Sequence, residues 1–138
     1  MADKIIYTPI PQIEDLIFLV RGQRVIFDSE LARIYGVQLK RLNEQRRRNL
    51  DRFPKDFAFQ LTGQELATLR SQIATSKGRG GRRYLPWVFT EHGAIMLASI
   101  LNRDRAVQMS VSVVRAFVLM REQLAAFAQF GSDLDAKT

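Results

Sequence analysis

The chain has 138 residues, of which 46% are hydrophobic, and this is enough for one domain with a single core. It contains no cysteine, which excludes disulfide bonds and metal sites built on thiolates. Since no uncharged apolar run approaches the roughly 18 residues of a membrane span, we expect no transmembrane helix and a cytoplasmic location.

The net charge is +7, and the excess of basic over acidic residues is confined to two segments of the sequence. Residues 21–55 hold ten lysines and arginines against four acids, and residues 70–83 hold five basic residues and no acid. A chain that is basic only for solubility would spread its charge. This distribution is typical of a surface that binds phosphates.

A β-hairpin followed by a helix-turn-helix is predicted for the N-terminal third. The β-prone runs Leu16–Val20 and Arg24–Phe27 form the hairpin. Asp28 is expected to cap the first helix, and Gly36 can take the left-handed conformation of a tight turn. The buried face of the first helix is expected to hold Leu31, Ala32 and Ile34. The second helix of such a motif lies in the major groove of DNA.

A helical projection divides the second helix into two faces. The inner face is expected to hold Leu39, Leu42, Asn49, Leu50 and Phe53. The outer face is expected to hold Lys40, Arg41, Glu44, Arg47, Arg48 and Asp51, with Gln38 at the entry. Arg46 projects inward, either because the phase is shifted or because it contacts a carboxylate such as Glu30. The alternative for the outer face is a solvated surface without a ligand.

Pro54 is expected to end the second helix. Residues 57–61 alternate as in a half-buried strand, with Phe57, Phe59 and Leu61 on one side and Ala58 and Gln60 on the other. Thr62 and Glu65 have the spacing of a capping box, which predicts a helix to about Thr75. Its inward residues are expected to be Leu66, Leu69 and Ile73.

Residues 76–83 contain three glycines and four basic residues and are predicted to be an exposed loop. They lack the Gly-Lys-Ser/Thr ending of a nucleotide-binding loop. The loop is either a solvated connection or an arm that contacts the DNA backbone or minor groove, and its charge favours the arm. The candidate DNA contacts in it are Lys77, Arg79, Arg82 and Arg83.

A strand over residues 84–89 is expected at a sheet edge, because Pro86 lies within it. Aromatic residues at strand spacing are interpreted as core: Phe57, Phe59, Tyr84, Trp87 and Phe89. Tyr84 and Trp87 are the two that could instead stack on bases.

Thr90 is expected to cap a helix that runs through Ile100. Asp104 is expected to cap a long last helix that runs to about Phe130. A heptad-like apolar seam follows that helix: Val113, Phe117, Met120, Leu124 and Phe127. Its first half is expected to pack on the domain, and the half beyond Met120 on a second copy, which gives a homodimer. The expected organisation is a flexible segment 1–10, one domain over 11–130 and a disordered tail 131–138.

Catalysis is not expected from this sequence. His92 is the only histidine and has one carboxylate beside it, Glu91, which is too few groups for acid–base or metal chemistry. We therefore expect a binding module, with no cofactor and no metal.

Several runs of the sequence resemble the ORF-six-N domain of phage and prophage proteins, which is related to the KilA-N and Bro-N domains. The resemblance covers about residues 10–125 and implies a DNA-binding domain of phage regulators, including proteins of antirepressor type. The runs that carry it are Gly22-Gln23-Arg24-Val25, Asp28-Ser29-Glu30-Leu31-Ala32, Tyr35-Gly36-Val37, Lys40-Arg41-Leu42-Asn43-Glu44-Gln45, Arg52-Phe53-Pro54-Lys55-Asp56-Phe57, Leu69-Arg70-Ser71-Gln72, Gly78-Arg79-Gly80-Gly81-Arg82-Arg83-Tyr84-Leu85-Pro86 and Phe89-Thr90-Glu91-His92-Gly93.

The sequence thus predicts an α+β domain that binds double-stranded DNA as a transcriptional regulator in a bacterial or phage-infected cell. Arginine can read guanine and Glu44 can accept from cytosine, while Lys40 and the outer arginines hold phosphates. Two alternatives stay open. One is a protein-interaction module that sequesters a repressor through the C-terminal helix. The other is an RNA binder that uses Tyr84, Trp87 and the basic loop.

Overall fold

The computed structural model describes residues 12–72 and 85–137, with side chains described for 12–71 and 85–126. The expected flexible segment 1–10 and the basic loop 76–83 lie outside the described residues, as do Ile73 and Tyr84.

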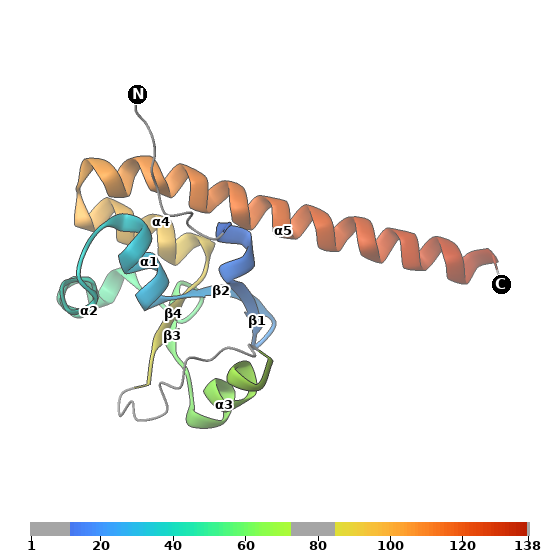
Figure 1. The fold of residues 1–138 in the computed structure, drawn as a ribbon, viewed down its shortest axis with the longest axis horizontal. Coiled ribbons are helices and arrows are strands. Elements are labelled where there is room, and N and C mark those ends of the chain that lie inside the picture. Colours follow the sequence, from blue (N-terminus) through green and yellow to red (C-terminus); the bar gives the residue numbers. More distant parts are fainter. Residues whose placement is uncertain (1–11, 73–84, 138) are drawn as a thin grey trace.

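Four antiparallel strands form one sheet in the order β1-β2-β4-β3, and helices cover both of its faces (Figure 1). The strands are β1 (Ile17–Val20), β2 (Gln23–Phe27), β3 (Ala58–Gln60) and β4 (Trp87–Phe89). The α-helices are α1 (Asp28–Tyr35), α2 (Leu39–Arg48), α3 (Gly63–Gln72), α4 (Glu91–Leu101) and α5 (Asp104–Lys137). Short 3₁₀ turns lie at η2 (Ile13–Leu16) and η3 (Leu50–Arg52). The predicted α+β class with a long C-terminal helix is confirmed.

Neighbouring side chains of the sheet point into two separate cores. Ile26 and Ala58 join the larger core beneath α1, α4 and α5, whereas Val25 and Phe59 join a smaller core against α3. The prediction that the Ala58 side of this strand faces solvent is therefore wrong, because helices cover that face as well and Ala58 is buried. This arrangement leaves α2 beside the sheet rather than on top of it (Figure 1).

The position of β4 differs from the prediction. β4 lies inside the sheet, paired with both β2 and β3, and not at an edge. Pro86 precedes the strand, and its carbonyl oxygen accepts a hydrogen bond from the Leu61 N–H at 3.0 Å. Because the missing N–H of proline falls before the ladder, it does not prevent pairing on both sides.

The predicted hairpin is present, and a tight turn joins α1 to α2. Arg21 and Gly22 form a two-residue turn in which both have positive φ, 54° and 75°, as in the hairpin turns that match the twist of the strands. Gly36 has φ 73° at the end of α1, and the Val37 N–H donates to the Ala32 carbonyl at 2.9 Å. This left-handed residue turns the chain into α2.

Asp28 does not cap α1 as predicted. Phe27 occupies the N-cap position, and Asp28 is the first helical residue, fully buried. Its carboxylate accepts from the Ser29 N–H of α1 and also from groups of other elements. Asp104 likewise is the first residue of α5 rather than its cap.

Two helix ends also differ from the prediction. α2 ends at Arg48, well before Pro54, because the Asn49 side chain donates to the Gln45 carbonyl and the Asn49 backbone leaves the helical region. Leu50, expected inside, is 63% exposed. At the other end of the chain, α5 continues to Lys137 through the segment for which a disordered tail was predicted.

The predicted caps of the two intervening helices are confirmed. The Thr62 N–H donates to Glu65 Oε1 at 2.8 Å and the Glu65 N–H to Thr62 Oγ1 at 3.1 Å, which is the reciprocal capping box of α3. Thr90 Oγ1 accepts from the Gly93 N–H at the start of α4.

Candidate nucleic-acid interface

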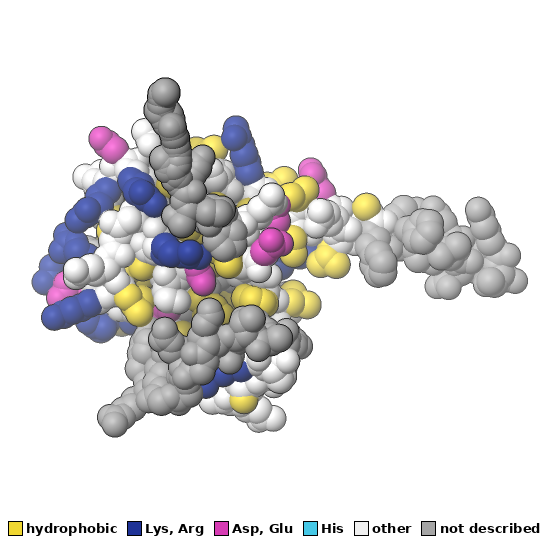
Figure 2. Space-filling view, viewed as in Figure 1, with side chains coloured by type: hydrophobic (Ala, Val, Ile, Leu, Met, Phe, Trp, Pro, Cys, Tyr) yellow, Lys and Arg dark blue, Asp and Glu magenta, His cyan; other side chains and the backbone are white. Residues whose placement is uncertain are grey.

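The outer surface of α2 gathers the basic residues predicted for DNA contact. Figure 2 shows Lys and Arg side chains clustered over α2, at one end of the molecule. Of the residues predicted to contact DNA from this part of the chain, Glu44 is half-buried and the others are exposed: Gln38, Lys40, Arg41, Arg47 and Arg48. The predictions for Lys77, Arg79, Arg82 and Arg83 lie outside the described residues.

Helical periodicity arranges these cations in two rows on the outer surface. Lys40 and Arg47 are seven residues apart, which is two turns, and lie on one flank of α2; Arg41 and Arg48 have the same spacing on the other flank. Within the described part of the chain, none of these four side chains forms an ion pair or a hydrogen bond. Their charge is therefore not neutralised by the fold described.

Four arginines elsewhere in the described residues are held by other groups of the fold. Arg21 Nε is 2.7 Å from Glu65 Oε2, Arg33 pairs with Glu30 at 2.5 Å, and Arg121 pairs with Glu91. Arg105 Nε donates to the Ile34 carbonyl at 3.0 Å, which fixes α5 against the end of α1. The four cations on the outer surface of α2 thus differ from these arginines, which have partners within the fold.

A buried polar network supports α2 from beneath. Asn43 Nδ2 donates to Asp28 Oδ2 at 3.2 Å, and Arg46 Nε donates to Asn43 Oδ1 at 3.1 Å. The same Asp28 oxygen accepts from the Trp87 N–H at 3.2 Å, and the Arg46 guanidinium lies 3.8 Å from the centre of the Trp87 ring. The network therefore ties α2 to α1 and to β4 at once.

This network was only partly predictable. The helical projection correctly placed Arg46 on the inner surface, and its burial is confirmed. The suggested partner Glu30 is wrong, since Arg46 contacts Asn43 and Trp87 while Glu30 pairs with Arg33. The sequence signal for Asp28 is a carboxylate between the apolar residues of a strand and a helix, and this pattern is equally typical of a helix cap.

A cleft of about 430 Å³ opens between α2 and the ends of β3 and β4. We call it the α2 cleft. Its lining residues are Leu39, Lys40, Asn43, Arg46, Arg47, Gln60 and Trp87.

The aromatic and histidine residues considered for stacking or catalysis pack against other side chains in the described part of the chain. Phe59 and Phe89 are buried, as the core interpretation predicted, and the Arg46 guanidinium packs on the Trp87 ring. His92 is exposed in the first turn of α4 and stacks on Phe57, with ring centres 5.4 Å apart. Among the described residues, no cluster of three His, Cys, Asp or Glu could hold a metal ion, and no helix has the length and apolarity needed to cross a membrane.

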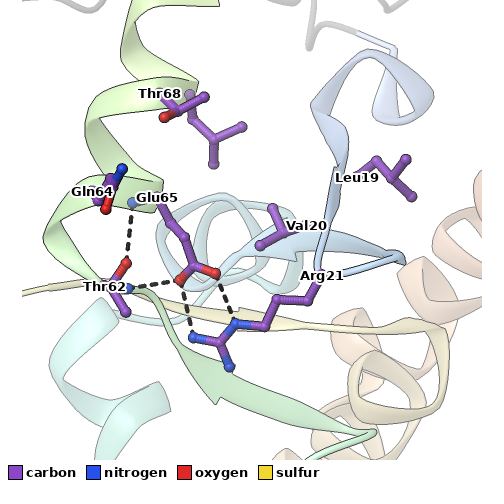
Figure 3. Close-up of a pocket in the computed structure, with 8 residues that line it drawn as sticks. Leu19, Val20, Arg21, Thr62, Gln64, Glu65 and Thr68 are labelled. Carbon is purple, nitrogen blue, oxygen red and sulfur yellow. Dashed lines mark hydrogen bonds and ion pairs between the residues drawn. The ribbon is translucent and has the colours of Figure 1, made fainter.

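A separate ion pair lies on the far side of the sheet, between the hairpin and α3. Figure 3 shows Arg21 reaching the Glu65 carboxylate, which also accepts from the Thr62 N–H. These two partners lower the pKa of Glu65 from 4.5 to about 2. The Glu65 carboxylate is therefore ionised throughout the neutral range and stabilises the contact between hairpin and helix.

Deep in the larger core, burial raises the pKa of the Tyr35 hydroxyl, which donates to the Ala94 carbonyl at 2.9 Å.

One family model matches the chain. The model of the ORF6N domain, the ORF-six-N domain of the sequence analysis, matches residues 15–100. The match spans the sheet, α1 to α3 and nearly all of α4, and so includes the α2 surface and the α2 cleft. No curated protein and no solved structure gives a significant match.

Proposed function

The chain belongs to the ORF6N domain family, which is associated with phages, and we propose that it is a phage-type regulator that binds double-stranded DNA through α2. The observation that carries this proposal is the set of four cationic side chains on α2 that have no partner within the described residues.

The dimensions of α2 suit the major groove. A helix of ten residues is about 15 Å long, and the major groove is about 12 Å wide, so an exposed helix of this length can lie in it. In a helix-turn-helix the second helix takes this position. Arg41 and Arg48 on one flank can donate to guanine, Glu44 can accept from cytosine, and the other flank faces a backbone.

Duplex DNA is favoured over single-stranded RNA by the state of the aromatic side chains. A base-stacking platform needs aromatic rings with a free face. Among the described residues Phe59 and Phe89 are buried, and one face of Trp87 is covered by Arg46. The exposed groups near α2 are cations and amides, which suit the polar edges and phosphates of a duplex.

The test is a comparison of ligands and of matched variants by fluorescence anisotropy. We expect tighter binding to a labelled duplex than to an RNA strand of equal length. The double variant Arg41→Ala, Arg48→Ala should weaken duplex binding at least tenfold, since two cationic contacts are lost. The control Arg103→Ala, Arg115→Ala removes two exposed arginines, one directly before α5 and one within it, and should change duplex binding little. Equal losses in both variants, or tighter binding to RNA, would contradict the proposal.

The C-terminal helix supports a second copy as a partner. α5 extends away from the domain (Figure 1), with Val113 and Phe117 buried in the core and Leu124 43% exposed. We propose that the stretch around Leu124 pairs with the same helix of another chain, which would place two α2 helices on one DNA site.

Sedimentation of the intact chain and of Leu124→Glu tests this pairing. The wild type is expected to be a dimer and the variant a monomer, while Gln123→Glu, which changes the charge of the neighbouring position, should stay a dimer. A monomeric wild type would contradict the homodimer and favour a different protein, such as a repressor, as the occupant.

A further inference from the structure

The α2 cleft differs from the other cavities in its charge. Three of its lining residues are cationic, Lys40, Arg46 and Arg47, and none is acidic. The other cavities described each include a carboxylate: Glu65 beside the hairpin, Asp56 and Glu91 beside α4, and Glu14 beside α5. The α2 cleft is therefore the one of these four suited to an anion.

We propose that the α2 cleft holds one backbone phosphate of the bound DNA. The inference rests on the proposed function and specifies which residues fix the strand. Lys40 and Arg47 belong to the flank of α2 that borders the cleft, so their long side chains can converge on one group between them. Arg41 and Arg48 lie on the opposite flank and do not line it.

Arg46 gives the cleft a fixed positive charge. Its guanidinium is held by Asn43 and by the Trp87 ring, so little side-chain entropy is lost when an anion approaches. Asp28, the carboxylate of the network, is fully buried, accepts from Asn43 and from the Trp87 N–H, and does not line the cleft. A phosphate at the mouth of the cleft therefore faces cations and an amide rather than that carboxylate.

A phosphate suits this cleft better than a base. A base would need a free aromatic face, and the Trp87 ring is covered by Arg46 on one side. A diester phosphate needs two or three donors carrying positive charge, which Lys40, Arg47 and the wall of the cleft supply. The occupant is thus expected to be bound without regard to the base attached to it.

A scan with neutral methylphosphonate linkages tests the assignment. A duplex is prepared in a series in which each member replaces one phosphate, and its affinity is measured with the wild type and with four single variants. One position should weaken wild-type binding about tenfold, the loss expected for one charge-assisted contact. Both Lys40→Ala and Arg47→Ala should become insensitive to that same position. The matched variants Arg41→Ala and Arg48→Ala should stay sensitive to it. The proposal is overturned if Lys40 and Arg47 respond to different positions, or if all four variants stay sensitive.

The single tryptophan separates this proposal from the proposed function. Inorganic phosphate is titrated into the intact chain while the emission of Trp87 is followed. If no duplex binds but phosphate changes the emission in the wild type and not in Lys40→Ala, the DNA function is overturned and the cleft remains an anion site. If neither duplex nor phosphate has an effect, both proposals are overturned.

Discussion

The inner and outer surfaces of α2 carry the same residue type in opposite environments. Arg46 on the inner surface is 6% exposed and is held by Asn43 and Trp87, whereas Arg47 and Arg48 on the outer surface are exposed and unpaired within the described residues. Since three successive helical residues are rotated by about 100° each, adjacent arginines reach different surroundings. A count of basic residues therefore does not separate those that stabilise the fold from those that can bind a ligand.

The largest expected effect comes from the inner surface. Arg46→Ala removes a hydrogen bond and a guanidinium–indole contact from a buried site and should lower the free energy of unfolding by about 2–4 kcal/mol. Arg48→Ala should change it by less than about 0.5 kcal/mol, because an exposed arginine without a partner contributes little. Urea denaturation measures both. A similar loss for the two variants would remove the distinction between the surfaces.

The outer surface should show its effect in binding instead. Arg41→Ala is expected to weaken binding to a selected duplex by about 1–3 kcal/mol and to relax the preference at one base pair, as for an arginine that reads guanine. Lys77→Ala should weaken all sequences alike, as for a phosphate contact. Binding of both variants to a panel of single-base changes decides this. If only Lys77→Ala alters the preference, the roles of helix and loop are reversed.

The Arg21–Glu65 pair shows how much a surface arginine with a partner is expected to contribute to the free energy of unfolding. Glu65→Gln should cost about 0.5–1 kcal/mol at pH 7, because the pair is partly exposed and screened by solvent. Since folding lowers the pKa of Glu65 from 4.5 to about 2, its stabilisation is complete above about pH 5 and is lost as the pH falls towards 2. The difference in unfolding free energy between wild type and variant should therefore shrink over that range. A difference that stays constant down to pH 2 would contradict the role given to the pair.

The smallest effect is expected at an exposed pair within one helix. Arg33→Ala breaks the contact with Glu30 one turn earlier in α1 and should cost at most about 0.5 kcal/mol. Thermal unfolding of this variant, compared with Arg46→Ala, completes the scale from exposed to buried arginine.

Local signals in the sequence predicted local structure well. The positive φ at Gly36, the capping box of Thr62 and Glu65 and the inward direction of Arg46 each follow from rules that act within a few residues. The α2 surface was predictable for the same reason, since the projection of one helix decides which side chains are outside.

Features set by distant contacts were missed. Asp28 is a residue type that often caps helices, but one oxygen of its carboxylate accepts a hydrogen bond from the backbone N–H of Trp87, 59 residues later. β4 lies inside the sheet because it pairs with both β2 and β3, which are distant in sequence. The local sequence contains only Pro86, which favours an edge. The α2 cleft joins residues of α2, β3 and β4, so no single stretch of sequence could reveal it.

The salt dependence of duplex binding tests the central claim most directly. If about five cationic side chains contact phosphates, the logarithm of the binding constant should fall against the logarithm of salt concentration with a slope of about −4 to −5. The double variant Lys40→Ala, Arg47→Ala should make that slope shallower, by about one unit for each phosphate contact removed. A flat response of the wild type, or an unchanged slope in the variant, would contradict DNA binding through the basic surface of α2.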